Sequence, residues 1–205
     1  NLPYLNGVYI AVGAVADAYL VVDGPFCVFT KTEVHFGHDV GSTLVSQTES
    51  GRVLQTDLRV GVTPVHSLSV DRSREVVQVL ERVAGYPDAG VVLLTSMDFH
   101  QLLGAPLDRY RRRAAQAGGA PIVLLECHSL DGDWLDGYAM VLEGLAAAID
   151  LPEPDPAEDR VAVVGHFMDR NAGDHAGNLS ELERMLGWLG LELVSVWLDG
   201  GSVRS

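Results

Sequence analysis

The side chains best suited to chemistry stand at the ends of short apolar runs, and the first of them is Cys27. It follows the run Leu20-Val21-Val22, from which Asp23-Gly24-Pro25-Phe26 separates it. A β-branched apolar run of this kind predicts a buried parallel strand, and Gly24-Pro25 predicts its end. A thiol just past a strand is a metal or cluster ligand, a nucleophile or a small buried side chain. Position alone leaves these alternatives open.

Three further polar groups follow apolar runs in the same way. They are Ser96-Met97-Asp98, Cys127-His128-Ser129 and His166. Open α/β sheets bind their ligands at the carboxyl ends of strands, so His128, Ser129 and His166 are expected where a substrate cleft opens. Asp98 is either a metal ligand or a helix N-cap, and Cys127 is more typical of a packed thiol.

Two other patterns favour ordinary surface roles. His35 and His38 are three residues apart and could share one face and bind a metal, but such pairs are more often solvated or part of a proton relay. A cluster of arginines spans residues 109–113. It fits a solvated helix end, which the helix macrodipole favours, better than a surface that steers an acidic partner.

The elements that must position these groups alternate between strands and helices. Apolar runs predict strands at 19–22, 91–95, 122–125, 161–164 and 193–198, with an extended segment at 53–62. Helical periodicity predicts helices at 71–84, 107–117, 134–149 and 179–189, and residues 5–16 are ambiguous between helix and strand. Because such alternation builds right-handed βαβ units, the predicted fold class is α/β with Rossmann-like parallel-sheet domains.

Two patterns in the last of these helices predict where it begins and which face is buried. Ser180 and Glu183 have the spacing of a capping box, which predicts the start of the helix. A stripe at helical spacing, Leu182, Met185, Leu186 and Leu189, predicts its buried face.

A proline-rich acidic run at 151–159 predicts a linker between domains. We therefore expect a first domain at 1–150 and the beginning of a second one at 160–205. The sequence starts without methionine and stops shortly after a predicted strand. We expect it to be a fragment of a longer subunit.

Composition and charge exclude several classes of protein. The chain has 14 basic and 28 acidic residues and a net charge of −14, which argues against a nucleic-acid partner. No apolar run approaches the roughly 20 residues that span a membrane. The 2 cysteines do not make a disulfide framework, so a reducing cytoplasm is the expected compartment.

The order of these segments resembles the nitrogenase component 1 family, which includes the catalytic subunits of dark-operative protochlorophyllide reductase. The run Leu-Val-Val-Asp-Gly-Pro-Phe-Cys at 20–27 is similar to a family strand and its His-Gly-Pro-x-Gly-Cys segment, whose cysteine binds an iron–sulfur cluster. Residues 94–104 resemble the family's strand and Cys-x-x-x-x-Ile-Gly-Asp-Asp turn. Further similar segments are Glu126–Leu130 with Gly137-Tyr138, Val161–Gly165, Leu179–Leu193 and Gly200–Ser202.

This resemblance implies parallel-sheet domains of the nitrogenase component 1 type and a subunit of an oxidoreductase. An ATP-dependent iron–sulfur reductase would pass single electrons to a cluster, of the 4Fe–4S type, that is shared between the subunits of a homodimer or heterodimer. Cys27 matches a cluster ligand, and Gly24 belongs to the same cofactor-binding segment. Met97 or Asp98 aligns with a later ligand position that the family fills with cysteine. Clusters usually need four thiolates, so a second subunit would have to contribute.

Two other functions stay open at this stage. One is a non-catalytic scaffold or carrier that binds a metallocluster or a tetrapyrrole during cofactor assembly. The other is a Rossmann-like module without a cluster, in which Cys27 only packs. A shared fold supports all three, because function lies in the site and not in the fold.

Overall fold

The computed structural model describes residues 3–24, 52–56, 71–102, 104–126, 131–150, 157–166 and 174–203. Within these residues a parallel sheet has the strand order β2-β1-β3-β4. Its strands are β1 (Ala18–Asp23), β2 (Val53–Gln55), β3 (Val91–Ser96) and β4 (Ile122–Leu124). β1 pairs with β3 along its whole length, from Ala18 opposite Val91 to Asp23 opposite Ser96. The carboxyl ends of the two strands therefore lie side by side.

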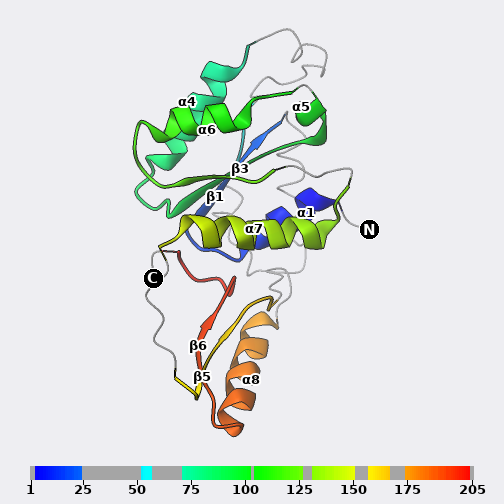
Figure 1. The fold of residues 1–205 in the computed structure, drawn as a ribbon, viewed down its shortest axis with the longest axis vertical. Coiled ribbons are helices and arrows are strands. Elements are labelled where there is room, and N and C mark those ends of the chain that lie inside the picture. The colour runs from blue at the N-terminus through cyan, green and yellow to red at the C-terminus, as the bar shows by residue number, and fades with distance from the viewer. Residues whose placement is uncertain are drawn as a thin grey trace.

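Helices cover both faces of this sheet (Figure 1). One face packs against α1 (Tyr4–Gly13) and α7 (Trp134–Ala148), and the other against α4 (Ser73–Ala84) and α6 (Leu107–Ala115). Successive side chains of a strand point to opposite faces, so Leu20 and Val22 join the first core while Val21 joins the second. Every residue of β1 and β3 is buried, which explains why both strands form continuous apolar runs in the sequence.

The segment whose type the sequence left ambiguous is the helix α1. Nine of its ten residues are buried, so it has no polar face to give a helical period. A Cβ built on Gly7 would lie 1.7 Å from the Trp134 carbonyl oxygen, and one built on Gly137 would lie 2.1 Å from that of Tyr4. The backbones of α1 and α7 are therefore in direct contact, and only glycine fits at these two positions.

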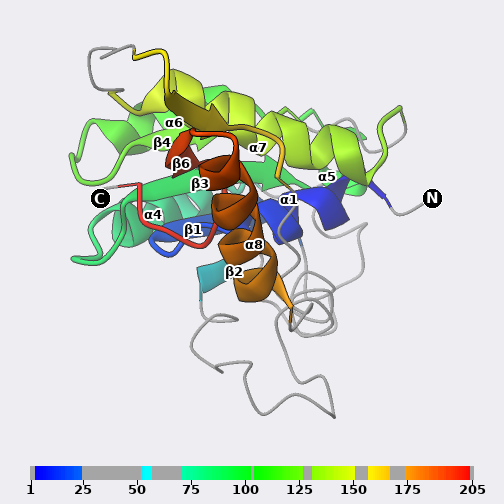
Figure 2. The same cartoon turned by 90° about the horizontal axis from the view of Figure 1, so that it is seen from below.

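A second, separate parallel sheet pairs β5 (Arg160–Val163) with β6 (Glu192–Val196) and packs against α8 (His175–Trp188). Figure 1 shows this unit below the first one, and Figure 2 shows it from below with α8 nearest the viewer. Residues 151–156 of the expected linker lie outside the described residues. The division into domains stays a prediction.

Two expectations about α8 are wrong. The helix begins at His175, before the predicted capping box, and the Ser180 hydroxyl donates to the Ala176 carbonyl at 3.0 Å, a bond that serine commonly makes inside helices. The leucine stripe is not buried: Met185 and Leu189 are 53% and 74% exposed. The reason is that a two-stranded sheet is too small to cover the helix.

Hydrogen bonds tie the end of the second unit to the turn that precedes β1. The Ala16 amide donates to the Gly201 carbonyl at 2.8 Å, and the Gly200 amide donates to the Ala14 carbonyl at 2.9 Å. The Asp17 carboxylate accepts bonds from the Ser202 hydroxyl and the Val203 amide at 2.6 and 2.8 Å. The two units therefore contact each other at the amino end of β1. No helix of the described residues is both long and apolar enough to cross a membrane.

Tyr19 of β1 is expected to make the free energy of unfolding depend on pH in the alkaline range. Its hydroxyl donates to Asp88 Oδ2 at 2.8 Å, and burial together with the Asp88 carboxylate raises the pKa of Tyr19 from 10.0 to about 12. Because the pKa is raised in the folded state, this stabilisation is complete below pH 10 and is lost as the pH rises through about 12. We expect the free energy of unfolding to fall over this interval in the wild type and to change less in Tyr19→Phe, measured by urea denaturation at each pH.

Candidate functional site

The carboxyl ends of β1 and β3 form the topological switch point of the first sheet. From β1 the chain passes to β2 on one side and then returns to β3 on the other. Ligands of open α/β sheets bind in the crevice outside such a point. Asp23 ends β1, its register partner Ser96 ends β3, and Gly24 is the last described residue before Cys27.

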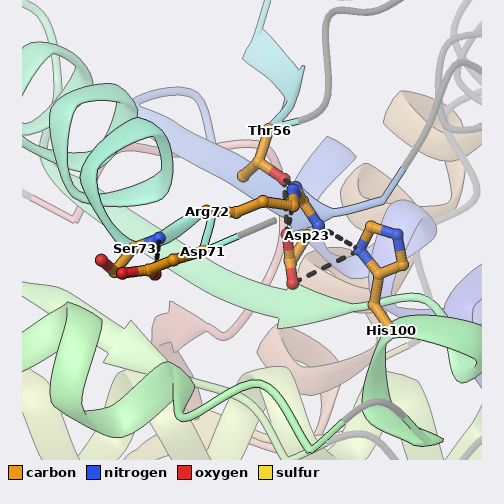
Figure 3. Close-up of polar contacts among 6 residues, drawn as sticks. All are labelled: Asp23, Thr56, Asp71, Arg72, Ser73 and His100. Atoms are coloured by element: carbon orange, nitrogen blue, oxygen red, sulfur yellow. Dashed lines mark hydrogen bonds and ion pairs between the residues drawn. The ribbon is translucent and has the colours of Figure 1, made fainter. Parts of the chain in front are cut away.

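Four polar side chains meet at this edge and form what we term the buried ionic cluster: Asp23, Thr56, Arg72 and His100 (Figure 3). They are between 1% and 7% exposed. Arg72 Nη2 donates to Asp23 Oδ1 at 2.7 Å and to Thr56 Oγ1 at 2.5 Å, and Arg72 Nη1 lies 2.8 Å from His100 Nδ1. The Thr56 hydroxyl completes the set by donating to Asp23 Oδ1 at 2.5 Å.

Each member of the cluster comes from a different element of the sheet edge. Thr56 directly follows β2, and its amide donates to the Val22 carbonyl at 3.2 Å. Arg72 directly precedes α4. His100 lies in the short helix α5 (Asp98–Leu102). The His100 amide donates to the Met97 carbonyl at 2.9 Å, which closes the first turn of this helix. The cluster therefore links the end of β1 to the residues that follow β2, precede α4 and form α5.

The imidazole of His100 faces both charged members of the cluster. A guanidinium can only donate, so Arg72 Nη1 is the donor toward His100 Nδ1. His100 Nδ1 also lies 3.4 Å from Asp23 Oδ2, so the ring stands beside the carboxylate whose charge Arg72 balances.

The electrostatic consequence for Asp23 has two opposing parts. Burial raises the pKa of this carboxyl, but the neighbouring imidazole, the Arg72 guanidinium and the Thr56 hydroxyl together outweigh burial, so the pKa lies below its ordinary value. Asp23 is thus ionised and already paired, which leaves it unsuited to bind a metal. Within the described residues Arg72 Nε is buried without a hydrogen-bond partner.

The structure places the predicted site residues as follows. Gly24 is buried directly after β1, and Asp98 is the first residue of α5, directly past β3. The two segments are brought to one edge of the sheet, whereas His166 follows β5 of the other sheet. Cys27, Cys127, His128, Ser129, His35 and His38 lie outside the described residues.

Potential metal ligands do not gather in larger groups among the described residues. No group of three or more His, Cys, Asp or Glu side chains among them is placed to hold a metal ion. Both cysteines, at 27 and 127, lie outside that part of the chain.

Two arginines of α6 form ion pairs with an aspartate of the same helix. Arg111 and Arg112 both pair with Asp108 at 2.7 Å. Arg109 and Arg112 also line a cavity of about 480 Å³ at the carboxyl ends of β3 and β4, together with Ser96 and Glu126. This cavity extends the same edge of the sheet, beside the buried ionic cluster.

Sequence reasoning missed Thr56, Arg72 and His100. One signal pointed to them: an aspartate at the end of a buried strand needs a partner, because an unpaired buried charge is costly. Local sequence patterns do not identify these partners, because Thr56 and Arg72 are 33 and 49 residues away from Asp23 along the chain.

Comparisons with known proteins agree with the fold. The sequence pattern of nitrogenase component 1 type oxidoreductases matches residues 6–205. Two solved structures of nitrogenase Cp1, at pH 5 and at pH 6.5, superpose with a TM-score of 0.66 in each case, at 14% and 13% identity, and cover 96% and 97% of this chain. The chain spans 39% and 40% of those two nitrogenase chains, and no curated protein matches.

At this level of identity the superposition shows the α/β fold, as the alternating strands and helices predicted. The family pattern extends over both sheets and over the edge that carries the buried ionic cluster. The chain therefore belongs to the nitrogenase component 1 type oxidoreductase family.

Proposed function

We propose that the chain is part of a nitrogenase-like oxidoreductase subunit in which Cys27 is a thiolate ligand of an iron–sulfur cluster. The observation that supports the proposal is the position of Asp23 and Gly24: Asp23 ends β1 at the switch point of the first sheet, and Gly24 follows it, three residues before Cys27 in the sequence. The family generally binds iron–sulfur clusters and works in multi-subunit complexes with a reductase component. An iron–sulfur cluster supplies one-electron transfer.

The buried ionic cluster limits where Cys27 lies. Asp23 is held by hydrogen bonds with Arg72 and Thr56, so the backbone at Gly24, the next residue, has a defined position. Cys27 is the third residue after Gly24, and an extended chain covers at most about 3.6 Å per residue. Chain length therefore keeps the Cα atom of Cys27 within roughly 11 Å of that of Gly24.

The small number of thiols points to a site between subunits. Clusters of the 4Fe–4S type usually take four thiolates, and this chain has 2 cysteines. A related subunit, in a homodimer or a heterodimer, would contribute the others. Asp98 begins α5 at the same edge and is the carboxylate we propose as a further ligand.

In this proposal the electrons come from a separate ATP-dependent iron–sulfur reductase and pass to a substrate. The net charge of −14 agrees with the proposal that no nucleic acid takes part. The cytoplasm is the proposed compartment, because thiols stay reduced there.

Iron and sulfide content of protein purified without oxygen tests the role of Cys27. We expect iron and acid-labile sulfide in the wild type, a loss of most of both in Cys27→Ala, and little change in Cys127→Ala, the matched control. Circular dichroism would check that each variant is folded. Equal iron and sulfide in wild type and Cys27→Ala would overturn the assignment.

A non-catalytic scaffold or carrier is the second candidate, and the low cysteine content favours it over a tightly held resident cluster. Anaerobic mixing with an iron–sulfur reductase and MgATP separates the two. An oxidoreductase subunit is expected to accept electrons only when ATP is hydrolysed, whereas a carrier is expected to release its bound group to an acceptor protein without ATP.

A further inference from the structure

Two histidines meet at the carboxyl edge of the second sheet, away from the buried ionic cluster. His166 follows β5 after Gly165, whose φ of +87° turns the chain there. His175 is the first residue of α8, and Asp199 follows β6. β5 and β6 are parallel, so all three residues lie at the edge where open α/β sheets bind ligands.

The separation of the two imidazoles suits a shared metal ion. Their ring centroids are 5.6 Å apart and the rings are inclined by 42°. A metal held about 2.0–2.1 Å from each ring nitrogen lies roughly 3 Å from each ring centre, so a tetrahedral angle places the two centres roughly 5 Å apart. The observed separation of 5.6 Å between the ring centres is close to this value.

The hydrogen bonds leave one nitrogen of each ring for a ligand. His175 Nε2 lies 3.3 Å from the Asp199 carbonyl oxygen, which can only accept, so Nε2 carries the proton and Nδ1 has a free lone pair. A bond from the second ring nitrogen to a backbone carbonyl is the usual orientation of a metal-binding histidine. His166 Nε2 is buried without a hydrogen-bond partner in the described part of the chain.

A side chain of the first unit contacts the backbone of His166. The Tyr138 hydroxyl of α7 donates to the His166 carbonyl at 3.4 Å, and Tyr138 itself is buried. This contact links the two units at the histidine pair. A ligand bound there would touch a place where the units meet.

We propose that His166 Nε2 and His175 Nδ1 bind a divalent transition metal ion, such as Zn²⁺ or Ni²⁺, for which imidazole is a suitable ligand. The Asp199 carboxylate accepts a hydrogen bond from the Gly201 amide at 2.9 Å. No third His, Cys, Asp or Glu is in place among the described residues, so water completes the coordination. Such an open site holds an exchangeable ion, and it does not depend on the role proposed for Cys27.

Calorimetric titration of the metal-free full chain with Zn²⁺ tests the site. We expect one ion to bind, and His166→Ala and His175→Ala each to weaken its affinity by more than about tenfold, because even the outer partners of metal ligands are worth about 10–100-fold. The matched control is the double variant His35→Ala, His38→Ala, which removes two histidines elsewhere and should bind like the wild type. Cys27→Ala should also bind like the wild type, so the two proposals fail independently.

Unchanged Zn²⁺ affinity in both single variants would overturn the proposal, as would loss of binding in the His35, His38 double variant. If His166→Ala does not fold, as judged by circular dichroism, His166→Asn replaces it, since its amide keeps polar character but is a poor ligand for Zn²⁺. A His166→Asn protein that binds as tightly as the wild type would equally contradict the site.

Discussion

Replacing Arg72 with methionine is expected to lower the free energy of unfolding by about 3–5 kcal/mol at neutral pH, as is typical when one partner of a buried ion pair is removed. The side chain is 8% exposed and its Asp23 partner is 1% exposed. Without the guanidinium, Asp23 is left as a buried and uncompensated charge. Urea denaturation followed by circular dichroism measures the loss.

The double variant Asp23→Asn, Arg72→Met is the control for this interpretation. Because it removes both charges together, we expect it to lose less than the sum of the two single variants. Strict additivity of the single losses would contradict a direct pairing of Asp23 with Arg72.

The loss in Arg72→Met should also depend on pH. In the wild type the pKa of Asp23 is below its ordinary value, so its contribution to stability is present above the unfolded-state pKa of about 3.9 and is lost as the pH falls through the lower folded value. In Arg72→Met, burial without a cation raises the pKa of Asp23. The deficit relative to the wild type should therefore be largest near neutral pH and shrink as the pH falls toward about 4.

The second large effect is expected from Gly137→Ala in α7. The added Cβ would lie 2.1 Å from the Tyr4 carbonyl oxygen and 3.2 Å from the Val8 amide nitrogen. These are backbone atoms of α1, which cannot move aside as the end of a flexible side chain can. We expect a loss of about 3 kcal/mol or more, the upper end of what overpacking costs.

Gly187→Ala in α8 is the matched control for this substitution. Nothing lies within 4 Å of a Cβ built there, so we expect a gain of roughly 0.5–1 kcal/mol from the better helix propensity of alanine. Thermal unfolding of both variants compares the two sites directly. Similar changes in melting temperature for the two would show that α1 and α7 are not in backbone contact.

Much of the fold could be predicted from local patterns. The apolar runs of β1 and β3 and the amphipathic period of α4 are set by which faces are buried, and those faces show in the sequence. α1 could not be recognised because it is buried all round. The start of α8 was misplaced because Ser180 bonds within the helix instead of capping it.

The candidate site could be predicted only in part. The edge of the sheet followed from the position of Asp23 and Gly24 after a buried run. The partners of Asp23 did not follow, since they come from three other segments and no local pattern records long-range pairing. The histidine pair was missed for the same reason: the sequence predicts His166 at a strand end, but its approach to His175 of α8 is a property of the folded unit.

The most direct test of the central proposal is the electron paramagnetic resonance spectrum of anaerobically purified protein reduced with dithionite, recorded for the wild type and for Cys27→Ala. The proposal predicts a reduced-cluster signal in the wild type that is absent from Cys27→Ala. The same signal at the same intensity in both proteins would contradict it.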